Sequence, residues 1–266
     1  MYKKILVLLL VLPLSACTAF GFLFDRLPWL TAWHMDDLFD LRDEQRIQVK
    51  ASAKAMQQWM KDEGFPLLIS DLETTQSLWE NGQLEQAATH LEQSIRQRLD
   101  AFFTVLSPHL VSFLLTLDAS QAEHYRAYND SKVEEWFEHA ESNKAKQEHR
   151  LEKLEDWFGS LNDEQEPLVA QHILLLNDEY TVRVQNNQHW KERMLSAALQ
   201  GDKQALSEWT QNFSLWWTDD YRQLREQNRA QWHALLKQLL PSLSTRQREH
   251  AAERVSDWAD NLRSVL

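Results

Sequence analysis

The chain of 266 residues contains 40 Asp and Glu against 28 Lys and Arg, which gives a formal net charge of −12. An acidic body is repelled by phosphate backbones, and this excludes nucleic-acid binding as its main task. The 12 Trp, 11 Phe and 5 Tyr supply apolar surface for a packed core, and the 5 Gly and 6 Pro are few enough to favour long helices over disorder.

The first element along the chain is predicted to be a secretory signal peptide over residues 1–16. A basic start precedes an apolar run at residues 5–12, which is too short to span a bilayer. Leu14-Ser15-Ala16-Cys17 follows, and this tetrapeptide resembles the lipobox of bacterial lipoproteins. The resemblance implies that the leader is removed, that Cys17 carries acyl chains such as palmitate, and that the protein is held at the periplasmic face of the outer membrane.

Cys17 is also the only cysteine, so neither an internal disulfide nor a Cys–His zinc site is predicted. Apart from the covalent lipid, no cofactor is expected. Residues 17–27 are expected to form the lipidated anchor and tether. Two interpretations are open for the apolar stretch at residues 20–30: it lies at the lipid surface next to the anchor, or it docks onto the helical body.

Residues 28–266 are predicted to form an all-α domain, a multi-helix bundle of long amphipathic helices, with a subdivision near residue 160 left open. Apolar residues recur at steps of three and four, as on one face of a helix, and no comparable stretch alternates strictly. The helices are predicted at residues 28–37, 43–62, 66–79, 84–106, 109–116, 119–158, 163–200, 202–240 and 245–263. The residues expected to end helices are Gly64, Gly82, Pro108, Gly159, Gly201 and Pro241.

The helix predicted at residues 119–158 is almost wholly polar between residues 138 and 150. A helix that is polar all round is usually exposed to solvent. Two interpretations are open for this segment: a projecting arm that binds a partner, and a solvated connecting helix.

A five-residue pattern that begins with Leu and ends with Gln recurs at four predicted helix starts. At such a start, a short polar side chain accepts from an unpaired backbone N–H, and the Gln reaches back to the N–H of the capping residue. In one copy Arg42 occupies the capping position, so Asp40 is expected to cap instead. The copies are Leu41–Gln45, Leu117–Gln121, Leu161–Gln165 and Leu243–Gln247.

The pattern resembles the Leu-Thr-x-x-Gln motif of small periplasmic stress proteins of the Spy and CpxP type, with Asp, Asn or Ser in place of Thr. The resemblance implies a helical, ATP-independent protein that binds unfolded or membrane-associated clients. The alternative is that the copies are only good helix caps, each worth about 1 kcal/mol. The candidate interaction residues from this pattern are Gln45, Gln121, Gln165 and Gln247.

Longer stretches resemble an uncharacterised, DUF6279-like family of proteobacterial lipoproteins. Residues 33–41 carry the Trp-x-x-Asp-Asp-x-x-Asp-Leu pattern of that family's opening. Residues 150–161, which include Trp157, resemble its central signature, and Asn228-Arg229 fits its C-terminal part. This resemblance implies a helical lipoprotein and carries no activity with it.

Asp36, Asp37 and Asp40 place three carboxylates within five residues. On a helix, Asp36 and Asp40 share a face and repel each other unless something neutralises them. Two interpretations are open, a structural ion pair with a nearby Arg and a site for a divalent cation or another ligand. The ten His show neither HxxxH nor HExxH spacing, so no metal site is predicted from histidine.

Trp216 and Trp217 belong to an aromatic stripe at helical spacing, a pattern typical of a core. Consecutive side chains on a helix point about 100° apart. One of the two is therefore expected near the surface, where it can contact a peptide, a lipid or a glycan.

The sequence has no GxSxG nucleophile motif and no Gly-rich phosphate loop. The function expected from these features is that of a non-enzymatic, outer-membrane-anchored lipoprotein that binds protein clients or an envelope partner in a chaperone-like way. Two alternatives are open. The acidic and Trp-rich composition favours an enzyme or activator acting on peptidoglycan or glycans, and the anchored helical body favours a structural subunit of an envelope complex.

Overall fold

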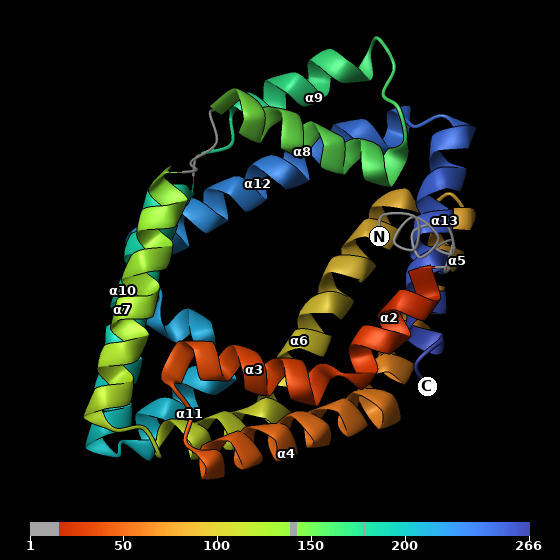
Figure 1. Ribbon diagram of the computed structural model, residues 1–266. Helices are drawn as coiled ribbons and strands as arrows, with labels where there is room; N and C mark the ends of the chain where they lie inside the picture. The colour runs from red at the N-terminus through yellow and green to blue at the C-terminus, as the bar shows by residue number, and fades with distance from the viewer. Residues whose placement is uncertain (1–15, 139–142, 178) are drawn as a thin grey trace, which may run out of the picture.

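The computed structural model describes residues 16–138, 143–177 and 179–266, and within these ranges the chain is all-α with no strand (Figure 1). This confirms the predicted fold class. The predicted signal peptide, apart from Ala16, and residues 139–142 of the polar segment lie outside the described residues.

The elements are α2 (Ala16–Asp25), α3 (Leu27–Phe39), α4 (Asp43–Trp59), the π-helical turn η1 (Met60–Gly64), α5 (Phe65–Glu80), α6 (Leu84–Leu114), α7 (Ala119–Glu138), α8 (Asn143–Phe158), α9 (Gln165–Leu174), α10 (Tyr180–Gln200), α11 (Lys203–Gln211), the 3-10 turn η2 (Phe213–Trp216), α12 (Asp219–Ser242) and α13 (Thr245–Arg263).

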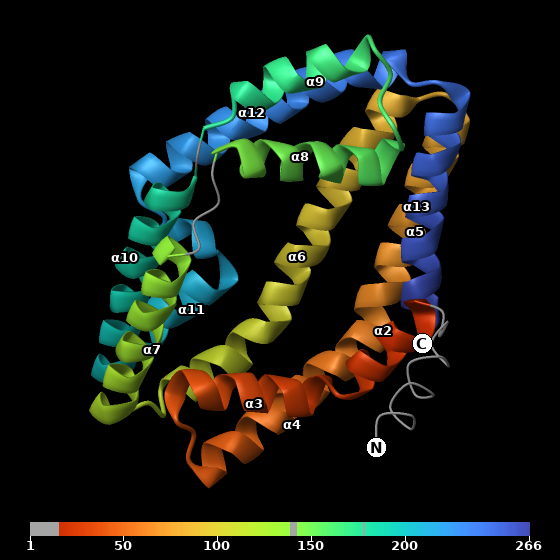
Figure 2. The same cartoon turned by 45° about the horizontal axis from the view of Figure 1, so that its top comes forward.

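Neighbouring helices run side by side in pairs, and the pairs follow one another around a frame (Figures 1 and 2). Helix α3 packs against α4, α5 against α13, α9 against α12, and α7 against α10. The 31-residue helix α6 joins the sides of the frame, because it contacts α4, α5, α11 and α12. The fold is therefore a multi-helix assembly in which one long helix contacts helices from several sides of the frame.

Buried side chains gather in two large cores, one toward each end of α6. Toward its C-terminal end, Val111 and Leu114 pack with side chains from α3, α4, α7, α10 and α11. Toward its N-terminal end, Leu84 packs with side chains from α8, α9, α12 and α13. Burying an aliphatic side chain of this size contributes about 1.5–3 kcal/mol, so α6 is fixed at both ends.

The predicted ends at Gly64 and Pro108 are wrong, and Pro241 likewise lies inside a helix, α12, which continues to Ser242. Gly64 has helical backbone angles (φ −61°, ψ −52°), and the turn η1 carries the chain from α4 into α5 without a loop. Pro108 lies inside α6. Its ring removes one helical hydrogen bond, but Ser107 and Val111 on either side are buried, and the Ser107 hydroxyl bonds to that of Thr210 at 2.6 Å. These tertiary contacts keep the helix continuous.

The long helices predicted at residues 119–158, 163–200 and 202–240 are instead each divided. Helices α7 and α8 run in different directions on either side of residues 139–142 (Figure 1). Between α9 and α10, the buried Asn228 accepts a hydrogen bond from the N–H of Asn177 at 2.9 Å. Between η2 and α12, Asn186 accepts one from the N–H of Thr218 at 2.9 Å. Side chains from distant helices thus satisfy the backbone at two of these breaks.

Other predicted boundaries are confirmed. The helices expected at residues 28–37, 66–79 and 245–263 are α3, α5 and α13. Gly82 and Gly201 follow α5 and α10 with φ of 77° and 69°, a left-handed conformation that glycine adopts at little cost. Among the described residues, no helix alone is long and apolar enough to cross a membrane, and α6 with α7 passes by length and composition only as a pair bent by 117°.

Candidate functional site

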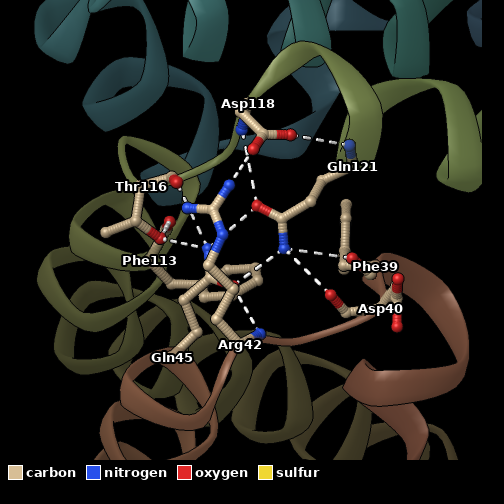
Figure 3. Close-up of polar contacts among 8 residues, drawn as sticks. All are labelled: Phe39, Asp40, Arg42, Gln45, Phe113, Thr116, Asp118 and Gln121. Carbon is tan, nitrogen blue, oxygen red and sulfur yellow. Dashed lines mark hydrogen bonds and ion pairs between the residues drawn. The ribbon is translucent and has the colours of Figure 1, made fainter.

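The four copies of the Leu-to-Gln pattern meet in two pairs, which we call the first and second glutamine junctions. In the first junction, Gln45 at the start of α4 meets Gln121 at the start of α7 (Figure 3). Nε2 of Gln45 donates to Oε1 of Gln121 at 3.0 Å, and Nε2 of Gln121 donates to Oε1 of Gln45 at 2.8 Å. The two amides therefore form a reciprocal pair.

Each glutamine of the first junction also binds backbone at a helix end. Oε1 of Gln45 accepts from the N–H of Arg42 at 3.0 Å, and its Nε2 donates to the carbonyl oxygen of Thr116 at 3.2 Å. Nε2 of Gln121 donates to the carbonyl oxygen of Phe39 at 3.1 Å. The pair thus links the end of α3 and the start of α4 to the end of α6 and the start of α7.

Capping differs between the two helices of the first junction. Asp118 accepts from the N–H of Gln121 at 2.9 Å, as the pattern predicts. Arg42 has no acceptor to offer and instead forms an ion pair with the Asp118 carboxylate (Figure 3). Asp40 has a left-handed backbone (φ 49°) and offers its carbonyl oxygen to Gln121 at 3.3 Å. The N-cap residue of α4 is Arg42, so the expectation that Asp40 caps this helix is wrong.

The second junction repeats the first with Gln165 and Gln247. Their reciprocal amide bonds measure 3.1 and 2.8 Å. Nε2 of Gln165 donates to the carbonyl oxygen of Ser242 at 3.0 Å, and Nε2 of Gln247 donates to that of Ser160 at 3.0 Å. Here the ends of α8 and α12 are linked to the starts of α9 and α13.

Neighbouring contacts repeat as well. One helical turn after Gln121, Nε2 of His124 lies 3.0 Å from the carbonyl oxygen of Asp37. One turn after Gln247, Nε2 of His250 lies 3.1 Å from the carbonyl oxygen of Asp156. The helices α3, α4, α6 and α7 therefore meet in the same way as α8, α9, α12 and α13, and the fold contains the same four-helix junction twice.

The glutamine side chains of both junctions are buried, with exposed fractions between 1% and 6%. Their amides bond to one another and to backbone, and this accounts for their chemistry as links between helix ends. A role for these four residues in contacting a client stays a prediction.

The acidic cluster is divided by the end of α3. Oδ1 of Asp36 lies 2.6 Å from the Arg46 guanidinium and accepts from the N–H of Leu41 at 3.0 Å. These contacts favour the ion-pair interpretation for Asp36. Asp37 lies exposed on the same helix. In the part of the chain that the structure describes, no group of three His, Cys, Asp or Glu could hold a metal ion.

The two adjacent tryptophans have different surroundings. Trp216 is buried and stacks on Trp209 with ring centroids 4.8 Å apart. Trp217 is half-buried and meets Tyr221 edge to face at 5.2 Å. Trp217 is therefore the member of the pair that lies nearer the surface.

Tryptophans from three helices line a groove of about 390 Å³, which we call the tryptophan groove. They are Trp79 of α5, Trp157 of α8 and Trp232 of α12, all half-buried. The Trp79 indole is fixed by donating to the carbonyl oxygen of Arg248 at 2.8 Å, and Trp157 packs edge to face on Trp258 at 5.0 Å. The other apolar residues that line the groove are Ala87, Ala88, Leu91, Ile95, Leu154, Phe158, Leu236, Leu240, Ala251, Ala252 and Val255.

A second cavity of about 600 Å³, with many charged residues in its lining, adjoins this groove, and we call it the arginine vestibule. Ala88, Glu92, Trp232 and Leu236 line both spaces, so the two lie side by side. Trp217 lies in the wall of the vestibule. Its basic residues are Arg96, Arg222, Arg225, Arg229 and His233.

Glu92 is the centre of charge pairing in the vestibule. It lies 2.7 Å from Arg229, 3.0 Å from His233 and 3.3 Å from Arg96. The side chains of Arg96 and Arg229 are each about half exposed, at 57% and 51%. Because a guanidinium carries five N–H donors, one carboxylate contact leaves donors that can meet a bound carboxylate or carbonyl. The vestibule is thus a donor-rich surface in an otherwise acidic chain.

The sequence model of one protein family matches residues 37–222. The chain belongs to this family, which is described as a family of unknown function, DUF6279. The DUF6279 match contains the first glutamine junction, Trp157 and Trp217, whereas Trp232 and Gln247 lie beyond it. No curated protein and no solved structure matches the chain.

Sequence reasoning singled out two tryptophans that line these spaces, Trp157 and Trp217, but did not bring them together. It missed Trp79, Trp232 and the arginines. One signal was available: Arg222, Arg225 and Arg229 recur at steps of three and four along one helix, an unusual basic stripe in a chain of net charge −12.

Proposed function

We propose that this chain is a non-enzymatic lipoprotein, anchored through acylated Cys17 to the periplasmic face of the outer membrane, that binds a segment of a protein client or partner in a chaperone-like way. The observation that carries the proposal is that the tryptophan groove and the arginine vestibule lie side by side and share four lining residues, Ala88, Glu92, Trp232 and Leu236. Binding sites combine concave apolar surface with a few polar groups that fix orientation, and this pair of spaces has both.

The lining of the groove suits an unfolded or extended polypeptide. Half-buried tryptophan faces supply large, rigid contact area for apolar side chains. The vestibule next to it offers guanidinium donors to backbone carbonyls and acidic side chains. A client would therefore place an apolar side chain between Trp157 and Trp232 and its polar neighbours beside Arg229.

Client binding is tested with a substitution that fills the tryptophan groove. Ala88 is half-buried and lines both spaces, so Ala88→Trp inserts a bulky ring where they meet. We expect the acylated wild-type protein in detergent to slow aggregation of an unfolded model protein, and Ala88→Trp to lose most of that effect. The matched control is Ala55→Trp on α4, at an exposed alanine, which should retain it.

Two safeguards keep this test decisive. Thermal melting reports whether Ala88→Trp folds, and Ala88→Leu is the smaller substitute if it does not. A wild-type protein that neither binds nor protects any unfolded client, or a folded groove variant that protects as well as the wild type, contradicts the proposal. Mass spectrometry of the protein from its own cells tests the acyl group on Cys17 separately.

A second candidate function, action on peptidoglycan or another glycan, has one observation in its favour. The vestibule holds Glu92, Glu179 and Glu226 together with Trp217 and Trp232, and paired carboxylates beside aromatic rings are what glycan hydrolysis uses. Against it, Glu92 is engaged by Arg96, Arg229 and His233, and Glu179 lies 3.4 Å from Arg225.

The glycan alternative is tested by incubating the acylated protein with purified peptidoglycan and separating the products. Release of soluble fragments that Glu226→Gln abolishes would support it. The alternative is removed if the protein alone releases no fragments and if it does not increase the amount of fragments that added hydrolases release. Cross-linking that returns one stoichiometric envelope protein would instead support the third candidate, a structural subunit.

A further inference from the structure

Helices α2 and α3 carry a concentration of exposed apolar side chains. Phe22, Leu23, Trp29 and Trp33 are each more than half exposed, between 55% and 57%. We call these four residues the aromatic face. Large aromatic residues that remain exposed together, rather than singly, mark a surface that contacts something else.

The aromatic face is not a loose end of the chain. The opposite side of α2 is held by Phe24, which is 7% exposed, packs on Phe65 with ring centroids 5.2 Å apart, and accepts a hydrogen bond at its carbonyl oxygen from Gln57 at 2.5 Å. In α3, Ala32 is 2% exposed. Both helices therefore bury one side on the body and present the other outward as a fixed surface. The two interpretations of residues 20–30 are compatible, because docking onto the body leaves an exposed apolar side.

The chemistry of the face suits the boundary between lipid and water. Trp29 and Trp33 lie parallel, with ring planes 6° apart and centroids separated by 6.3 Å. The Arg26 guanidinium lies 4.2 Å from the centre of the Phe22 ring. Tryptophan and arginine, each with an apolar body and a polar end, are the residues that gather at membrane interfaces.

The position of the aromatic face in the sequence, close to Cys17, indicates which partner it contacts. Cys17 belongs to α2 and precedes Phe22 by five residues of the same helix, which is about 7.5 Å of axial rise. An acyl chain on Cys17 would bring this part of the molecule to the membrane surface whatever the rest of the body does. A lipid surface is then the partner that the aromatic face meets first.

We propose that the aromatic face docks on the lipid surface beside the anchor and holds the helical body against the membrane instead of leaving it on a free tether. This inference rests on the lipid anchor of the proposed function and adds a fixed orientation to it. Asp25 and Asp37 are exposed next to the face, so docking should occur on zwitterionic lipid and need no anionic lipid.

The test uses the acylated full-length protein in vesicles of phosphatidylcholine alone. Since Cys17 is the only cysteine and its thiol would be blocked by lipid, Trp33→Cys supplies a single reactive thiol for an environment-sensitive fluorophore. The matched control is Leu174→Cys on α9, where the native side chain is 66% exposed. We expect several-fold brighter, blue-shifted emission from position 33 in vesicles, and water-like emission from position 174.

The outcomes separate this inference from the anchor on which it rests. Acylated Cys17 with water-like emission from position 33 contradicts docking and leaves the anchor intact. Unmodified Cys17, seen as a second labelled thiol by mass spectrometry, contradicts both. Blue-shifted emission from position 33 in a variant that also carries Cys17→Ala, and so has no acyl chain, measured in buffer without detergent or vesicles, would show that a second copy of the chain covers the face, and this also contradicts docking on lipid.

The expectation that docking needs no anionic lipid can be tested separately. Replacing part of the phosphatidylcholine by an anionic phospholipid should not increase the blue shift at position 33. A signal that depends on anionic lipid would contradict the role assigned to the acidic neighbours. Trp29→Ser in the labelled protein should reduce the shift, because it removes the exposed tryptophan that remains on the face after Trp33→Cys.

Discussion

At the scale of single residues, the fold depends on glutamines that are paired inside the protein. A buried amide that lacks partners costs about 1–3 kcal/mol, and each junction avoids this by matching two amides to each other and to backbone. The sequence predicted the local part of this arrangement, in which a Gln reaches back three residues to its own helix cap. It did not predict the pairing, because that joins residues 76 and 82 positions apart.

The first glutamine junction provides a stability prediction. Gln121→Leu removes the donor and acceptor that Gln45 and the backbone of Phe39 use, so buried groups lose their partners. We expect a loss of about 2–4 kcal/mol in the free energy of unfolding, measured by chemical denaturation. Gln58→Leu is the control, since Gln58 is exposed and bonds only to Asp62 on its own helix. Equal, small effects of the two variants would contradict a structural role for the junction.

Because of Tyr125, the free energy of unfolding is expected to depend on pH in the alkaline range. Burial raises the pKa of Tyr125 from 10.0 to about 12. Between these values the unfolded chain loses the phenolic proton while the folded chain keeps it, so the stabilisation is complete below pH 10 and falls as pH rises toward 12. Tyr125→Phe preserves the stacking on Phe39 at 4.6 Å and should make the fall between pH 10 and 12 shallower. Denaturation midpoints across this range measure it, with Tyr128→Phe on the same helix controlling for loss of a hydroxyl. An unchanged slope in Tyr125→Phe would contradict the assignment.

At the scale of elements, sequence reasoning succeeded where the signal was local and failed where a distant side chain decided the outcome. Helix α13 was predicted with its observed limits, because Ser244 and Gln247 form a complete capping box and the apolar period is regular. The segment between α9 and α10 contains no Gly or Pro that would predict a break in the helix. It depends on Asn228, which lies 51 residues further along the chain than Asn177.

Asn228→Ala tests the cause of that break. The variant removes the acceptor for the N–H of Asn177 and the donors to its carbonyl oxygen and to Glu179. We expect a loss of about 1–3 kcal/mol and faster hydrogen exchange at the backbone of residues 175–180. Asn81→Ala is the control, because Asn81 is exposed and bonds only within its own helix end. Unchanged exchange at the break would show that something other than Asn228 ends α9.

At the scale of the whole molecule, the second glutamine junction ties together the ends of α8, α12 and α13, and these helices line the tryptophan groove together with α5 and α6. The groove takes its tryptophans from α5, α8 and α12, and α6 forms its floor through Ala87, Leu91 and Ile95. The apolar periodicity predicted that these helices would be buried on one side. It could not predict a concave surface, because that depends on which helix ends are tied together.

The most direct measurement of the central claim is photo-cross-linking in intact cell envelopes, with a photoreactive amino acid at position 252 in the groove and, for comparison, at the exposed position 55. The account predicts that the groove probe captures polypeptide and that the probe on α4 captures far less. Equal capture at both positions, or capture of no protein from the groove, would contradict it.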